Sequence, residues 1–190
     1  MITETRIYGG MQMKKDINVF DYAGSIMNEM QKGALLTTCV DGKVNTMTIG
    51  WGMIGIQWSK PVFVAMIRES RYTRELLDKS GEFTVNVPYG EYDKKILGYC
   101  GTKSGRDTDK INDMKLTAEE PVSIGTPGIK ELPLTLECKV IYRQKQDAAA
   151  ISDVDKKEFY PQEPESEDPE ANRDYHIYYF AEIVNAYIIE

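Results

Sequence analysis

The strongest constraint on the fold is a series of short apolar segments, rich in β-branched and aromatic residues and separated by turn signals. They include "ALLTTCV" at 34–40, "VFVAMI" at 62–67 and "EFTVNVP" at 82–88. Asp41-Gly42 follows the first segment and suits the positive φ angles of a tight hairpin turn. Hairpin-linked strands with few helices favour an antiparallel sheet, and closing that sheet removes its exposed edges. We therefore expect a mainly β barrel with peripheral short helices.

Further elements follow from the same patterns. Apolar residues with helical spacing predict a helix over 19–30, a second helix is expected over 71–80 with Ser70 as its N-cap, and a third passes through Ile96 and Leu97. The segment 62–67 has no polar alternation and is expected to be buried on both faces. The remaining expectations are a returning strand at 45–61 ended by Pro61, a polar loop at 101–113, and two late strands at 132–144 and 176–189.

Composition excludes several classes of function. The chain has 190 residues, which is typical of one domain, and its net charge is −7, which argues against a general nucleic-acid surface. It has no apolar run of about 18 residues that could span a membrane, and its N-terminus lacks a signal-peptide core. Cys39, Cys100 and Cys138 form no C-x-x-C pair, so we expect neither disulfides nor a zinc site, and a reducing cytoplasm is the natural compartment.

Residues 145–174, between the two late strands, are polar and acidic. The segment "YPQEPESEDPEAN" within them carries three prolines. We interpret the stretch as an excursion with an exposed loop inside a single domain of residues 1–190, and not as a second domain.

The returning strand at 45–61 contains Gly50, Gly52 and Gly55, although glycine weakens a strand. Alternation along it predicts a bulky face directed at the core and a small face with room for a flat ligand. The bulky face comprises Met47, Ile49, Trp51 and Met53, and the small face comprises Thr46, Thr48, Gly50 and Gly52. From this strand alone, the favoured explanation is that the glycines kink it at a barrel corner.

Three arginines, Arg68, Arg71 and Arg74, gather where the strand 62–67 is followed by a helix. Helix N-termini attract anions, and arginine binds phosphate oxygens with two parallel hydrogen bonds. Ser70 and Thr73 add hydroxyl donors, so the segment is a candidate phosphate site. The alternative is a solvated basic turn.

The segment "CGTKSGRDTDK" at 100–110 is a donor-rich loop, but it lacks the spacing of a nucleotide P-loop. It could close over an anionic or polar ligand, or be an ordinary surface loop. His176 is the only histidine. No metal-ligand spacing and no nucleophile elbow accompany it, so a core-edge role is the default for this residue.

Taken together in order, these segments resemble the flavin reductase-like family of FMN-binding split barrels, which includes NAD(P)H:flavin oxidoreductases and flavoredoxin. The resemblance rests on "DGKVNTMTIGWGMI", "RESRYTRELLDKSGEFTVNVP", "CGTKSGRDTDK" and "HIYYFAEIV". It implies a six-stranded antiparallel Greek-key split barrel, a homodimer, and FMN bound near the subunit interface.

The resemblance also implies a set of site residues. The flavin ring and ribityl chain would lie against Thr46, Met47, Thr48, Gly50, Trp51, Gly52 and Met53. The phosphate would be held by Arg68, Ser70, Arg71 and Thr73. The later flavin-contacting loop would comprise Cys100, Gly101, Lys103, Ser104 and Lys110. His176 would lie near the flavin and the nicotinamide as the candidate catalytic residue.

The function implied is an FMN-dependent oxidoreductase that accepts hydride from NADH or NADPH and passes electrons to free flavin or another acceptor. Such chemistry belongs to the cofactor, so no catalytic acid–base pair is required. Gly50 and Gly52 stand where many members carry serine or a larger residue, Tyr175 replaces an acidic residue, and Ala181 replaces a glycine. Because these departures bear most on the nicotinamide side, an electron carrier without direct NAD(P)H activity is the alternative. A non-redox ligand-binding or assembly protein is a third possibility.

Overall fold

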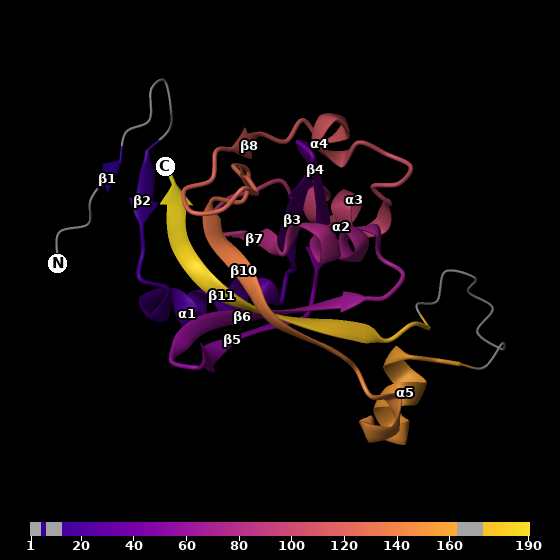
Figure 1. Cartoon of the computed structure of the whole chain (residues 1–190). Helices are drawn as coiled ribbons and strands as arrows, with labels where there is room; N and C mark the ends of the chain where they lie inside the picture. The colour runs from indigo at the N-terminus through magenta and orange to yellow at the C-terminus, as the bar shows by residue number, and fades with distance from the viewer. Residues whose placement is uncertain (1–4, 7–12, 163–172) are drawn as a thin grey trace.

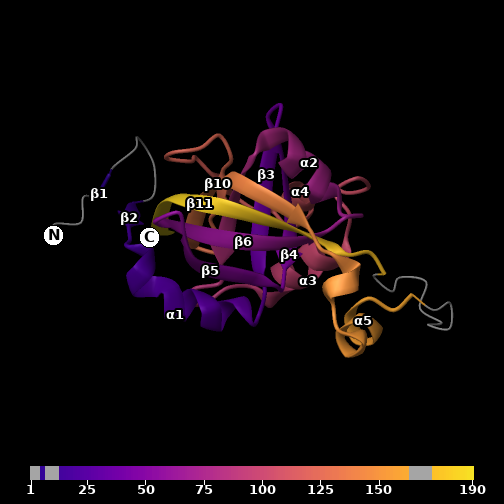
Figure 2. The ribbon, with the colours of Figure 1, turned by 60° about the horizontal axis from the view of Figure 1, so that its bottom comes forward.

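The computed structural model describes residues 5–6, 13–162 and 173–190 (Figure 1). One antiparallel sheet dominates these residues, and short helices surround it (Figures 1 and 2). The strands of this sheet are β1 Thr5–Arg6, β2 Lys14–Asp16, β3 Ala34–Val40, β4 Lys43–Ile49, β5 Gly52–Gln57, β6 Lys60–Arg68, β7 Glu82–Val87, β10 Leu134–Lys145 and β11 His176–Ile189. A separate pair joins β8 Ala118–Glu119 to β9 Gly128–Ile129. The helices are α1 Val19–Met30, α2 Tyr72–Ser80, α3 Lys94–Thr102, α4 Lys110–Asp113 and α5 Asp153–Phe159, with a 3-10 turn at Ala148–Ala150.

The sheet curls because β6, which follows β4 and β5 in the chain, pairs with β11. Neighbouring strands run in the order β1-β2-β11-β10-β7-β3-β4. Strand β6 pairs with the edge of β11 opposite β10, beyond the part paired with β2, and also with β5. Since β4 leads through Gly50 and Trp51 into β5, the sheet closes as a split barrel. The six predicted strands correspond to β3, the bent pair β4–β5, β6, β7, β10 and β11. The predicted mainly β fold is confirmed.

The single strand predicted over 45–61 is wrong in two places. The ladder breaks at Gly50 and Trp51, because β4 pairs with β3 whereas β5 pairs with β6. The glycine-rich stretch therefore turns a barrel corner. The chain reverses again at Trp58 and Ser59, which both have positive φ, and Pro61 lies inside β6 opposite Ile56 instead of ending a strand.

Two apolar clusters fill the interior. The larger one gathers the inner faces of β3, β6, β7, β10 and β11 with α1, and Leu36, Phe63, Phe83 and Tyr179 are almost fully buried there. A smaller cluster lies under α3, where Leu35 of β3 meets Ile96 and Leu97. Burial of each large side chain contributes roughly 1.5–3 kcal/mol. This second cluster holds α3 against the sheet, beside β4.

The helical predictions need three corrections. The N-cap of α2 is Arg71 and not Ser70, and it makes no side-chain capping hydrogen bond. The stretch 101–113 is not wholly a loop, since α3 continues to Thr102 and α4 begins at Lys110. The backbone N–H and the side-chain amide of Asn112 donate hydrogen bonds to the Asp109 carboxylate and stabilise this short helix.

The acidic excursion predicted at 145–174 contains a helix in its described part, while residues 163–172 lie outside the described residues. Ser152 caps α5 by accepting a hydrogen bond from the Asp155 amide, and Tyr160, which follows the helix, is buried. Two of the three prolines of the segment, Pro164 and Pro169, fall outside the described residues. No helix among residues 13–162 and 173–190 is long and apolar enough to cross a membrane.

Gly52 is required by packing, since a Cβ atom there would lie 2.6 Å from Phe63 Cζ and 3.3 Å from the carbonyl oxygen of Val64. Phe63 is 1% exposed and cannot move aside. We expect Gly52→Ala to lower the free energy of unfolding by about 1–3 kcal/mol in urea denaturation, the usual cost of overpacking. Gly55→Ala is the matched control on the same strand, because a Cβ atom there meets nothing within 4 Å. Equal stabilities of the two variants would contradict this account.

Candidate functional site

Two adjoining cavities bring most of the predicted site residues together. They share Met47, Thr48 and Arg71, and each encloses about 170 Å³. Neither alone reaches the roughly 300 Å³ at which ligand pockets begin, so a cofactor would need both. We call the joined space the trough. The predicted residues that line it are Met47, Thr48, Gly50, Trp51, Arg68, Ser70, Arg71, Thr73, Cys100, Gly101, Lys103, Ser104, Lys110 and His176.

Three predicted residues lie elsewhere. Thr46 is fully buried and its hydroxyl bonds Thr37 and the carbonyl of Leu36, so the small face of β4 is closed at this point. Gly52 and Met53 line a further, apolar cavity against α1, which adjoins the trough at Gly50, Trp51 and Met66.

The orientation predicted for Trp51 and Met53 is wrong. Both were expected in the core, but they are 39% and 48% exposed. The reason is the break at Gly50, which ends the alternation of β4 and starts β5 on a different partner strand. Met47 and Ile49, which precede the break, do pack against the core as predicted.

Lys110 links three elements that line the trough by hydrogen bonds. Its ammonium group is buried and donates to the carbonyl oxygens of Thr46 at 2.8 Å and Cys100 at 3.0 Å. Burial lowers the pKa of Lys110 and raises that of the Cys100 thiol to about 11. The thiol is therefore protonated and inert near neutral pH. Lys110 thus joins α4, α3 and β4 by charge-assisted hydrogen bonds.

Close approach of α3 to β4 shapes the middle of the trough. Thr48 Oγ1 donates to the Leu97 carbonyl at 2.7 Å. A Cβ atom on Gly101 would lie 3.3 Å from Thr48 Cβ, so a larger residue would push the helix outward. By contrast, a Cβ atom on Gly50 would meet nothing within 4 Å. The free space of the trough therefore lies toward Gly50 and Trp51.

At the start of α2, the Asp174 carboxylate already accepts a hydrogen bond from a backbone N–H that was a candidate anion donor. The backbone N–H of Ser70 donates to Asp174 Oδ2 at 2.7 Å. Thr73 is buried, and its hydroxyl accepts a hydrogen bond from the Asn45 amide at 2.9 Å. Arg71, which lines both parts of the trough, is the arginine here best placed to meet a ligand.

Arg68 is engaged with the acidic excursion. Its guanidinium donates to the carbonyl oxygens of Asp174 at 2.6 Å and Phe159 at 3.0 Å, and it lies 5.1 Å from the centre of the Tyr160 ring. Burial lowers the pKa of Arg68, and the nearby Asp174 carboxylate acts against this shift. In this arrangement Arg68 fastens the excursion to the end of β6, a role that the sequence did not indicate.

The excursion supplies site residues that sequence reasoning missed. The ring of Phe159 lies 5.2 Å from that of Trp51 in an edge-to-face contact, and Trp51 in turn lies 5.0 Å from His176. The hydroxyl of Tyr160 lies 2.8 Å from His176 Nδ1. A signal was present in the sequence, because the adjacent aromatic residues at 159 and 160 interrupt an otherwise polar, acidic stretch.

His176 is held in a buried, positively charged environment. It is 6% exposed, and burial together with Arg68 and Arg71 lowers its pKa to about 4, against a smaller opposing effect of Asp174. The imidazole is therefore neutral near pH 7. Its backbone N–H donates to Gln146 Oε1 at 3.1 Å, so the excursion root also positions its main chain.

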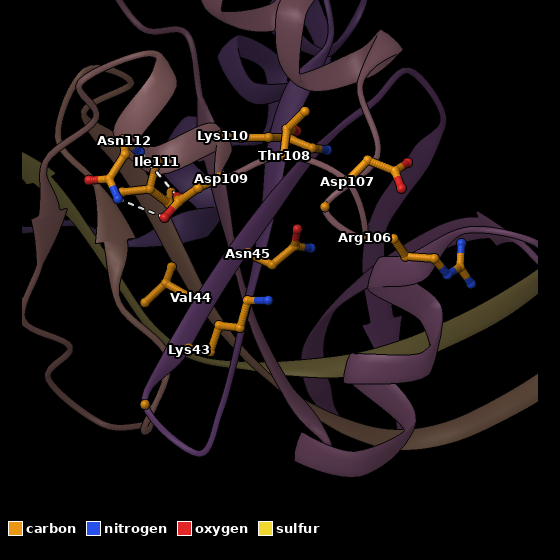
Figure 3. Close-up of a pocket in the computed structure, with 12 residues that line it drawn as sticks. Lys43, Val44, Asn45, Arg106, Asp107, Thr108, Asp109, Lys110, Ile111 and Asn112 are labelled. Atoms are coloured by element: carbon orange, nitrogen blue, oxygen red, sulfur yellow. Dashed lines mark hydrogen bonds between the residues drawn. The ribbon is translucent and has the colours of Figure 1, made fainter.

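A larger cavity of about 440 Å³ lies on the other side of the loop that joins α3 to α4 (Figure 3). Lys43, Asn45 and Arg106 border it, and Lys110 is the one predicted residue on its wall. Gly105 lets the loop pass over Asn45, since a Cβ atom there would collide with the Asn45 side chain. This cavity is separate from Trp51 and His176 and lacks their aromatic wall.

The residues of the trough fit a flavin mononucleotide in part. The end near Gly50, Trp51 and His176 offers open space beside flat side chains. The other end presents Arg71, Lys103 and Ser104, which are donors suited to a phosphate. The departure from the predicted arrangement is that Arg68 and the Ser70 N–H already bind groups of the excursion.

Comparison with known proteins agrees with this geometry. Residues 27–190 match the family model described as "Flavin reductase like domain", so the chain belongs to the flavin reductase-like family. A curated relative from Archaeoglobus fulgidus, an uncharacterized protein, is 36% identical over 99 residues, which cover 52% of this chain and 55% of the relative. The chain thus matches about half the length of its curated relatives.

Solved structures show the same fold. Flavoredoxin from Methanosarcina acetivorans is 27% identical with a TM-score of 0.57, and the match covers 83% of this chain and 68% of that one. An FMN-binding domain of a flavin reductase-like enzyme from Shewanella baltica is 16% identical with a TM-score of 0.62, covering 94% and 78%. The second match supports the fold alone.

The lowered pKa of His176 links its protonation to stability. Its pKa is about 4 in the folded chain, against 6.5 for an unperturbed histidine, so below pH 6.5 protons bind the unfolded chain preferentially. This site should therefore contribute nothing above pH 6.5 and remove roughly 3 kcal/mol of stability as the pH falls to 4.

His176→Gln should lack the loss of stability caused by the His176 imidazole. Its free energy of unfolding should therefore fall less steeply between pH 6.5 and 4 than that of the wild type. Urea denaturation at several pH values measures the difference. Parallel pH profiles for the two proteins would show that His176 titrates normally.

Proposed function

We propose that the protein is an FMN-dependent oxidoreductase that accepts hydride from NADH or NADPH and passes electrons to free flavin or another acceptor. The observation that carries the proposal is the trough, which joins a donor-rich end at α2 and the α3–α4 loop to an aromatic end at Trp51 and His176. Membership of the flavin reductase-like family supports it.

The chain's own residues would bind and orient the cofactor, while bound FMN would supply the redox chemistry. Arg71 and Ser104 would hold the phosphate by charge-assisted and neutral hydrogen bonds. Gly50 leaves space beside the strand, and Trp51, held by its contact with Phe159, would lie against the flavin ring. His176, neutral near pH 7, would serve as a hydrogen-bonding group and not as a general acid.

A second candidate is an FMN-binding electron carrier without direct NAD(P)H activity. Two observations favour it. Phe159 packs against Trp51 beside His176, at the end of the trough that a nicotinamide would have to reach. In addition, the flavoredoxin from Methanosarcina acetivorans is more similar in sequence to this chain than the flavin reductase-like domain from Shewanella baltica.

The visible spectrum of the purified protein tests both candidates. We expect flavin absorption bands, either as isolated or after FMN is added, and bleaching on anaerobic addition of NADH or NADPH. Flavin that is bound but bleached only by a reductase partner or dithionite would identify the electron carrier. Failure to bind FMN at all would refute both candidates.

Arg71 should contribute to FMN affinity through its phosphate. We expect Arg71→Ala to weaken FMN binding by about 1.5–3 kcal/mol, the range for one hydrogen bond to a charged group. Fluorescence quenching of the flavin on titration measures the dissociation constant.

Arg74→Ala is the matched control, because Arg74 stands on the same helix but pairs with Asp78 at 3.2 Å. It should leave the FMN affinity within about twofold. An unchanged affinity in Arg71→Ala would place the phosphate elsewhere.

We further propose a homodimer in the cytoplasm. Large apolar side chains are exposed on α1, on β5 and in the turn after β5, and among the described strands β5 pairs with β6 alone. They are Met27, Met53, Ile56 and Trp58. Such an edge needs cover, and a second copy of the chain would supply it. Sedimentation equilibrium showing a monomer at all concentrations would refute the dimer.

The three free cysteines are compatible with a reducing compartment, as the proposed cytoplasmic location requires.

A further inference from the structure

Tyr160 is fixed beside His176 by contacts on every side. The residue is 4% exposed, and its backbone N–H donates to the Lys156 carbonyl at the end of α5. Its ring stacks on Tyr175 with centroids 5.0 Å apart, and the Arg68 guanidinium lies 5.1 Å from its centre. The hydroxyl therefore has little freedom, and its 2.8 Å contact with His176 Nδ1 is a built feature of the fold.

The surroundings favour a neutral imidazole in this hydrogen bond. The positive charges of Arg68 and Arg71 face His176, and Asp174 is the nearby carboxylate. Burial and the two arginines disfavour an imidazolium, so one ring nitrogen donates and the other accepts. Burial raises the pKa of the Tyr160 phenol, which therefore keeps its proton near neutral pH. If the phenol directs its proton to Nδ1, the imidazole proton lies on Nε2.

We propose that Tyr160 is a positioning residue that holds His176 as a neutral Nε2–H donor toward the trough, so that the acidic excursion is part of the flavin site. His176 lines the trough, and among the described residues no hydrogen bond is made by Nε2. The ligand group it suits is a neutral acceptor, a carbonyl oxygen or ring nitrogen of a heteroaromatic ring. Its identification as the flavin rests on the proposed function.

Nitrogen-15 NMR tests the positioning without any flavin. His176 is the only histidine of the 190 residues, so the imidazole signals of labelled full-length protein need no assignment. We expect a neutral ring protonated at Nε2 at pH 6. Tyr160→Phe should mix the two tautomers and raise the His176 pKa by about half to one unit, because a bond to the neutral form is lost.

Tyr175→Phe is the matched control. It removes a phenol hydroxyl from the ring that stacks on Tyr160 and leaves the contact with His176 in place. Its imidazole signals should equal those of the wild type. A wild-type ring protonated at Nδ1, or identical signals in Tyr160→Phe and wild type, would overturn the proposal.

The midpoint potential of bound FMN tests the donor role, and it applies whether the protein is an oxidoreductase or an electron carrier. A donor near the ring stabilises the electron-rich reduced state, so Tyr160→Phe should shift the potential to more negative values while the FMN dissociation constant stays within about twofold. Tyr175→Phe should shift neither. An unchanged potential in Tyr160→Phe would overturn the donor role. Absence of FMN binding in the wild type would instead refute the proposed function and leave the NMR result to decide the positioning.

Discussion

The antiparallel pairing of β6 with β11 is the constraint on which the candidate site depends. Its ladder runs from Val62 opposite Glu182 to Arg68 opposite His176. Residues directly opposite each other in an antiparallel pair extend to the same face of the sheet. This last pair therefore brings Arg68 and His176, the only histidine, to one end of the trough. Because the core side chains of both strands are buried, a shift of register would expose them.

The same pair anchors the excursion. Beyond it the pairing continues as the Glu69 N–H donates to the Tyr175 carbonyl, and the Asp174 carboxylate accepts the hydrogen bond of the Ser70 amide. Arg68 also donates a hydrogen bond to the carbonyl of Phe159, which lies at the end of α5, well before Asp174 in the chain. Charge-assisted hydrogen bonds to buried groups are strong. An insertion between two strands thus contacts Trp51 and His176, two residues that line the cavity formed by those strands.

Much of the fold could be predicted because its signals are local. The spans of α1 and β3, the Asp41-Gly42 turn and the apolar run of β6 follow from period, turn chemistry and propensity within a few residues. For the same reason the start of α2 and the α3–α4 loop were recognised as donor-rich, and the structure places both on the trough. The errors at Ser70 and Pro61 concern the ends of elements, where hydrogen-bond geometry and not propensity decides.

The sequence by itself determined the strand and helix pattern, the family, and the set of polar segments from which a site could be built. Only the tertiary structure decided which of them meet. The break at Gly50 transfers the chain from β3 to β6 as partner and so turns Trp51 outward, which alternation along one strand cannot reveal. The contact of Tyr160 with His176 joins a helix end to a strand start, and both are positioned by Arg68 from a third element. Such contacts depend on the packing of segments far apart in the chain, and no local pattern encodes them.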